Sequence, residues 1–128
     1  MLVVVDTNIL VSALKTSGGK AYLLIEQILS GKIKICISSD IMAEYKDVLY
    51  RDKLGLDKHF VDYLLSWFVI HGLWIEPLPS SAERFPMVDE SDRKFFDVAK
   101  CLRANLVTGN FKHYPVDELV TSLNELFN

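Results

Sequence analysis

The 128-residue sequence has few of the residues that build disulfide scaffolds or zinc sites. Its two cysteines, Cys36 and Cys101, lie far apart and form no Cys-x-x-Cys motif. This argues against a disulfide framework, and we expect both to be reduced, buried thiols. The three histidines show no zinc-ligand spacing, which argues against the common zinc modules.

Long apolar segments and basic runs are also missing. The apolar run Leu2–Val5 ends at Asp6, and it is too short for a signal-peptide core or a membrane span. We therefore expect a cytoplasmic protein that does not associate with a membrane. Lys and Arg total 14 against 17 Asp and Glu, giving a net charge of −3. This excludes a generic basic coat for nucleic acid, so any nucleic acid must be held locally, for example through a metal ion.

What the sequence contains is typical of one globular α/β domain over residues 1–128, with 50% hydrophobic and 24% charged residues. The β-branched run Leu2–Val5 does not alternate with polar residues, which is typical of a strand covered on both faces. Further strands are expected at 33–37, 73–75, 104–107 and 119–121. Helices are expected at 9–14, 21–30, 41–50, 57–70, 91–103 and 123–127. This order, with short links, predicts a mostly parallel sheet of about five strands with helices on both faces.

Acidic and polar side chains follow several of these strands. In an open parallel sheet, function collects where the strands end at their carboxyl edges. Asp6 follows the first strand, Glu44 lies on the helix after the second, and Thr108 and Asn110 follow the fourth. Asp92 lies at the start of the helix that precedes the fourth strand. We therefore expect these side chains to lie near one another.

Asp6 is the strongest single candidate. An ionisable group that directly ends a fully apolar strand points into the crevice of the sheet, and few structural needs place it there. The alternative is that Asp6, together with Asn8, only caps the following helix.

Glu44 and Asp92 lie beside the apolar stripes of their helices. Taking Ile41 as zero, Glu44 lies near roughly −60° on a helical wheel, at the border of the stripe. Phe95, Phe96 and Ala99 lie within about 60° of Asp92 on the wheel of its helix. An unpaired carboxylate on a packing face is costly, so a partner or a metal is needed. The alternatives are that Glu44 curls into solvent and that Asp92 only complements the helix dipole.

Two further acids are expected at the surface. Asp97 lies at roughly 140° from Asp92, where it could pair with Arg93 at i,i+4. Asp89, in the preceding loop, is expected to be solvated.

Together, Asp6, Glu44 and Asp92 could form an acidic cluster. Carboxylates within a few Å raise one another's pKa unless a cation neutralises them. Oxygen ligands without suitable His or Cys favour Mg²⁺ or Mn²⁺ over zinc. Such an ion orients phosphate oxygens and lowers the pKa of an attacking water, so metal-assisted phosphodiester hydrolysis is the expected reaction.

The order and spacing of these residues resemble the PIN domain family. The motifs that carry the resemblance are Asp6-Thr7-Asn8, Glu44, Asp92 with Phe95 and Ala99, and Thr108-Gly109-Asn110. The strings 89–95 and 108–115 are similar to ones in the toxin-like branch related to VapC toxins. The resemblance extends from Val3 to about Phe127, nearly the whole chain.

The resemblance implies a three-layer α/β/α sandwich and a Mg²⁺- or Mn²⁺-dependent ribonuclease, often the toxin of a toxin–antitoxin pair. Asp6, Glu44 and Asp92 would be the metal-holding acids. Asn110 stands where the family has a fourth acid, a departure that brings no charge, so a second metal should bind more weakly. Asn110 could instead position water or serve only in a turn. Asn8 and Thr108 would support the site, Thr108 by hydrogen-bonding an acid.

The resemblance also implies partners. These are an RNA substrate, an antitoxin protein and, in a homodimer, a second copy of the chain.

Other functions stay open. A PIN-like domain weakened by Asn110 could act as a non-catalytic module that binds RNA or protein. A haloacid-dehalogenase-like phosphatase also begins with an apolar strand and an Asp, but it needs an acid where this chain has Asn8. A dinucleotide-binding fold is disfavoured because no Gly-x-Gly-x-x-Gly follows the first strand.

Overall fold

Five short parallel strands form the centre of the molecule, a computed structural model that describes residues 1–128. The sheet order is β3-β2-β1-β4-β5, and every neighbouring pair is parallel. The strands are β1 (Leu2–Val5), β2 (Lys34–Ile37), β3 (Leu73–Trp74), β4 (Asn105–Val107) and β5 (Val120–Thr121). The predicted parallel sheet is confirmed, with strand bounds within two residues of those expected.

Six α-helices connect and cover these strands. They are α1 (Thr7–Lys15), α2 (Lys20–Leu29), α3 (Ser39–Leu49), α4 (Lys58–His71), α5 (Arg93–Leu102) and α6 (Leu123–Leu126). Single 3-10 turns lie at Asp52–Leu54, Glu90–Asp92 and Phe111–His113. No helix among the six has both the length and the apolar character needed to cross a membrane.

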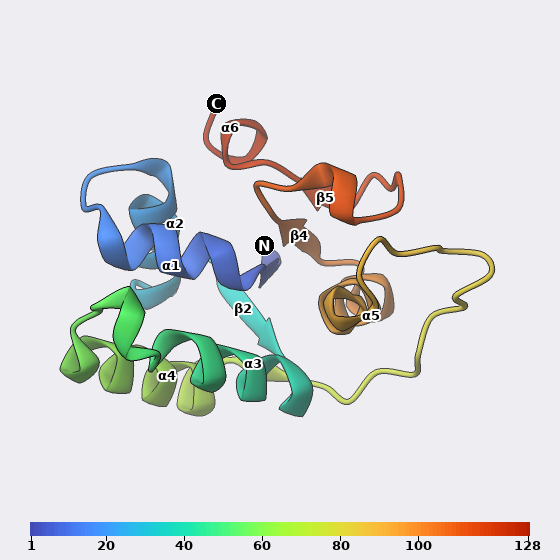
Figure 1. The fold of residues 1–128 in the computed structure, drawn as a ribbon. Helices are drawn as coiled ribbons and strands as arrows, with labels where there is room; N and C mark the ends of the chain where they lie inside the picture. The colour runs from blue at the N-terminus through green and yellow to red at the C-terminus, as the bar shows by residue number, and fades with distance from the viewer.

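The strand order explains the layers. The steps from β1 to β2 and from β2 to β3 run in one direction across the sheet, whereas the step from β3 to β4 runs back. Because parallel crossovers are right-handed, α1 to α4 must lie on one face and α5 on the other. Figure 1 shows this arrangement, with α5 across the sheet from α1 and α4, while α3 contacts α5 at the edge of the sheet. The predicted α/β/α sandwich is confirmed.

The core lies on both faces of β1. Val3, Val4 and Val5 are all fully buried, as expected for a strand covered on both sides. The Tyr45 ring packs near Phe95, with centroids 6.3 Å apart. Its hydroxyl donates to the carbonyl oxygen of Val5 at 2.5 Å. These contacts fix the end of β1, and with it the position of the residue that follows.

The start of α5 differs from the prediction. One continuous helix was expected over 91–103, but a 3-10 turn at Glu90–Asp92 comes first and α5 begins at Arg93. The reason is that the Asp89 carboxylate accepts the backbone N–H of Ser91 at 2.9 Å and caps this turn instead. Asp92 is consequently the residue immediately before α5.

Two surface predictions were wrong. Cys36 is buried as expected, but Cys101 is exposed on α5. Asp97 is half-buried and accepts the backbone N–H of Ser80 at 2.9 Å, because the segment before α5 folds over this helix. Arg93 is itself buried and pairs with Glu90 at 2.6 Å, not with Asp97.

Candidate functional site

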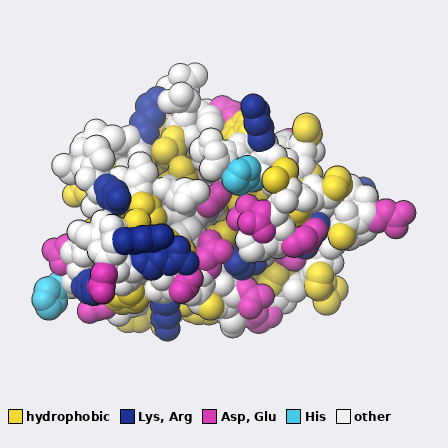
Figure 2. Space-filling model, viewed as in Figure 1, with side chains coloured by type: hydrophobic (Ala, Val, Ile, Leu, Met, Phe, Trp, Pro, Cys, Tyr) yellow, Lys and Arg dark blue, Asp and Glu magenta, His cyan; other side chains and the backbone are white.

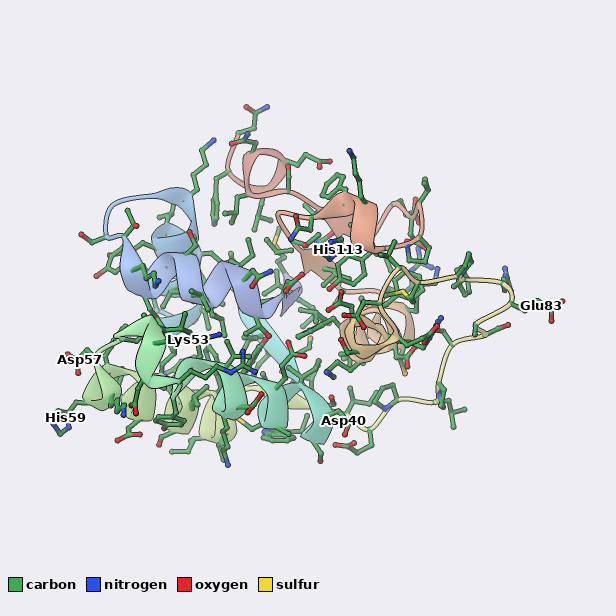
Figure 3. All side chains as sticks on the ribbon, viewed as in Figure 1. Asp40, Lys53, Asp57, His59, Glu83 and His113 are labelled. Carbon is green, nitrogen blue, oxygen red and sulfur yellow. The ribbon has the colours of Figure 1, made fainter.

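The carboxyl ends of the central strands bring the predicted acids to one edge of the sheet. Asp6 follows β1, Glu44 lies on the helix after β2, and Thr108 follows β4. Figure 2 shows acidic side chains gathered in the middle of this face beside a histidine, which Figure 3 labels as His113. A group of basic side chains lies to their left, where Figure 3 labels Lys53.

Asp6 is 6% exposed and its two carboxylate oxygens have different partners. Oδ1 accepts the backbone N–H of Asn8 at 3.3 Å, so Asp6 is the N-cap of α1. Oδ2 accepts two hydroxyl hydrogen bonds, from Thr108 Oγ1 at 2.9 Å and from Tyr114 Oη at 3.0 Å. Asp6 therefore does what the capping alternative requires, and it also has two donors from distant parts of the chain.

Glu44 does not curl freely into solvent. Its Oε2 accepts a hydrogen bond from the hydroxyl of Thr7, and its Oε1 lies 2.7 Å from the ammonium of Lys94. The Glu44 and Lys94 side chains are each 21% exposed, so solvent screens this pair only partly. The partner expected for a carboxylate at the edge of a packing face is thus a lysine from α5.

Asp92 faces the same centre. Its carboxylate lies 3.5 Å from Nδ1 of His113, which carries a charge only when the imidazole is protonated. Burial raises the pKa of Asp92, and the negative charges of Asp6, Asp89 and Glu44 raise it further. The three predicted acids therefore sense one another electrostatically.

Tyr114 reports the same field. Burial raises the pKa of its hydroxyl, and the charges of Asp6, Asp92 and Glu44 act in the same direction. The hydroxyl is thus held as a neutral donor to Asp6 across the accessible pH range.

The donor set fits a hard divalent cation by its chemistry. Asp6, Glu44 and Asp92 supply only carboxylate oxygens, the ligands that Mg²⁺ and Mn²⁺ prefer. Asp6 Oδ1 accepts only the long contact from Asn8 and keeps a lone pair free. As the side chains stand, no three His, Cys, Asp or Glu groups converge closely enough to hold one ion. Closing around a metal would require side-chain movement.

The remaining predicted residues act through their backbone or through a neighbour. Asn8 is exposed and contributes its backbone N–H to Asp6. Asn110 is also exposed, and its backbone N–H donates to Thr108 Oγ1 at 3.0 Å. Thr108 in turn makes the hydrogen bond to an acid that the resemblance implied.

Sequence reasoning missed Tyr114, Lys94 and Thr7. Tyr114 bonds to a residue 108 positions away, and Lys94 to one 50 positions away, so no local pattern marks either contact. Thr7 follows Asp6 directly, and a hydroxyl at the start of a helix usually indicates only capping.

Comparisons with known proteins bear on the family and the fold of the chain. A family model described as PIN domain matches residues 2–112. The fold is similar to that in the crystal structure of VapBC2 from Rickettsia felis bound to a DNA fragment from their promoter. The two chains share 24% sequence identity with a TM-score of 0.57, over 88% of this chain and 90% of the other. No curated protein matches this chain.

Proposed function

This chain belongs to the PIN domain family, and from that membership we propose that it is a divalent-metal-dependent nuclease that hydrolyses phosphodiester bonds of RNA. The observation that supports this most is the environment of Asp6. This buried carboxylate ends an apolar strand and accepts hydrogen bonds from two hydroxyls. Burial raises the pKa of Asp92, and the charge of Asp6 raises it further. Structural capping of α1 needs neither the second acid nor the hydroxyls.

Asp6, Glu44 and Asp92 would hold Mg²⁺ or Mn²⁺. Bound there, such an ion supplies positive charge that activates water for attack and stabilises charge on the phosphate. Thr108 and Tyr114 orient the Asp6 carboxylate by occupying Oδ2, which leaves Oδ1 the freer oxygen. The Lys94 ammonium holds Glu44, and its remaining N–H donors are available to a phosphate oxygen.

We also propose that the protein is the toxin of a toxin–antitoxin pair, with an antitoxin protein as its partner. The support is the resemblance of the strings 89–95 and 108–115 to the branch related to VapC toxins, together with the fold shared with VapBC2. A homodimer and a cytoplasmic location stay predictions.

A nuclease assay tests the proposal directly. Purified protein is incubated with a fluorescent single-stranded RNA and with a structured RNA, each in Mg²⁺, Mn²⁺ or EDTA. We expect cleavage that requires metal and is lost in Asp6→Asn, since Asn is an equally good N-cap and preserves α1. Asp40→Asn is the matched control, because Asp40 is exposed on α3 and lies away from His113 in Figure 3. Cleavage that persists in EDTA or in Asp6→Asn would reject the proposal.

The second candidate is a non-catalytic binding module, and Asn110 is the observation that favours it. This residue stands where the family has an acid, and its side chain is exposed. Asn110→Asp restores the charge. Nuclease activity in this variant, with none in the parent at any metal, would favour the module, whereas an active parent would dispose of it.

A further inference from the structure

A pocket of about 370 Å³ opens directly beside the candidate site. Its walls come from α1, the loop after β4, and the first residues of α2 and α6, and they include Ile9, Lys20, Thr108, Gly109, Leu123 and Asn124. We call this the Lys20 pocket. Thr108 belongs to both places, because it lines the pocket and donates to Asp6 at 2.9 Å. The Lys20 pocket is therefore adjacent to the carboxylates of the candidate site.

The charge of the Lys20 pocket is opposite to that of the site beside it. None of its seven lining residues is acidic, and Lys20 forms no salt bridge. Lys20 instead donates to the side-chain oxygen of Asn124 at 2.8 Å. Its ammonium keeps two further N–H donors, and the Asn124 amide keeps both of its own. A ligand here would meet several hydrogen-bond donors and one positive charge.

The pocket also has apolar surface and free space. Leu123 is half-buried and offers contact area to the face of a planar ring, while Ile9, which is 5% exposed, adds only a small apolar area to the wall. An added Cβ at Gly109 would meet no atom within 4 Å. The volume lies near the lower end of the range for small-molecule sites, which limits the occupant to about one nucleotide.

We infer that the Lys20 pocket is the subsite for the nucleotide next to the cleaved phosphodiester bond of single-stranded RNA. Lys20 contacts the neighbouring phosphate, Asn124 hydrogen-bonds the edge of the base, and the base lies against Leu123. This inference rests on the proposed nuclease function. It adds a base preference that the three carboxylates alone do not provide.

A second hollow provides a matched control for the Lys20 pocket. This hollow of about 330 Å³ is lined by Lys34, Trp67 and His71 among others, and it shares no residue with the candidate site. Lys34 is exposed, as Lys20 is. Lys20→Gln and Lys34→Gln therefore remove the same charge from two comparable hollows.

The test separates binding from cleavage. Anisotropy of fluorescein-labelled RNA hexamers that differ at one base is measured in EDTA over a range of salt, and cleavage is then measured in Mg²⁺. We expect Lys20→Gln to lower the slope of log Kd against log salt by about 0.7, the contribution of one phosphate contact in a single strand. Lys20→Gln should also raise KM and leave kcat unchanged. Lys20→Arg should restore the salt slope and KM of the parent. Asn124→Leu should reduce the differences in Kd among the hexamers, and Lys34→Gln should match the parent.

Two outcomes distinguish the inference from the function beneath it. If the parent cleaves RNA but Lys20→Gln and Asn124→Leu keep its salt slope, KM and base preference, the pocket is not a subsite and the nuclease proposal stands. If no protein cleaves but the salt slope still falls in Lys20→Gln, the pocket binds the strand and the nuclease proposal fails.

Discussion

Tyr114→Phe removes one oxygen from the centre of the site and leaves the ring in place. The Tyr114 hydroxyl lies 3.0 Å from Asp6 Oδ2. Tyr114 is only 6% exposed, so water does not easily take the place of the lost hydroxyl. A hydrogen bond to a charged group contributes about 1.5–3 kcal/mol to the free energy of unfolding. Because Thr108 still donates to the same oxygen, we expect the lower end, about 1.5 kcal/mol. For a domain of this size that lowers Tm by roughly 4–8 °C.

A double-mutant cycle with Asp6→Asn attributes the loss to the carboxylate. Unfolding by urea in EDTA is measured for the parent, both single variants and the double variant. Against a neutral amide the hydroxyl contributes only about 0.5–1.5 kcal/mol, so Tyr114→Phe should cost less in the Asp6→Asn background. Tyr63→Phe is the matched control, because Tyr63 is 55% exposed and its hydroxyl makes no hydrogen bond, so its effect should stay within about 0.5 kcal/mol.

The cycle can also refute the reasoning. An equal cost of Tyr114→Phe in both backgrounds would mean that the hydroxyl stabilises the fold without interacting with the Asp6 charge. The assignment of Tyr114 as a positioning residue for this carboxylate would then be wrong.

Three other measurements test the electrostatics and burial of the molecule. Lys94→Ala should tighten Mg²⁺ binding by up to about fivefold in calorimetric titrations, since Glu44 loses its cation, while cleavage falls. Unchanged Mg²⁺ affinity would separate this ion pair from the metal centre. Asp92→Asn should raise Tm at pH 7 in EDTA, because the raised pKa of Asp92 means that its negative charge opposes folding. The gain in Tm should vanish as the pH falls below 3.8, the ordinary pKa of an Asp, because the parent carboxyl is then protonated in both the folded and the unfolded state. A gain that persists at low pH would have another cause. In a thiol titration of the native protein, Cys101 should react and Cys36 should not, because Cys36 is buried and burial raises its pKa to about 11. Rapid reaction of both thiols would contradict the fold.

Elements with a strong local pattern could be predicted from the sequence. The β-branched run Leu2–Val5 can satisfy its side chains only between two covered faces, and it forms the central strand. The handedness of parallel crossovers then determines which helices cover which face. Asp6 could be found for the same reason, because a carboxylate that ends such a strand must lie at its carboxyl edge.

The exposure of Cys101 has a local signal in the sequence. Free cysteine is usually buried, and that tendency led to the prediction. On the wheel of α5, however, Cys101 lies at roughly 180° from Asp92, opposite the apolar stripe. The phase of the helix is the stronger constraint here, because α5 has only one face against the sheet.

The contacts at the site could not be predicted because they join distant segments. Lys94 reaches Glu44 only after α3 and α5 meet at the edge of the sheet. The orientation of the α5 side chains also depends on the 3-10 turn that precedes the helix. Asp and Ser are both good N-cap residues, so the sequence does not show whether Asp89 or Ser91 is the cap.

These same contacts explain how three facing acids are tolerated without a metal. No cation pairs with Asp6, but its negative charge is stabilised by two hydroxyl donors and by the first turn of α1. Glu44 has the Lys94 ammonium, and Asp92 keeps contact with His113 and with solvent. The capping and catalytic interpretations of Asp6 are therefore not alternatives: the cap uses one oxygen and orients the carboxylate, and Asp6→Asn separates the two roles because it keeps the cap and removes the charge.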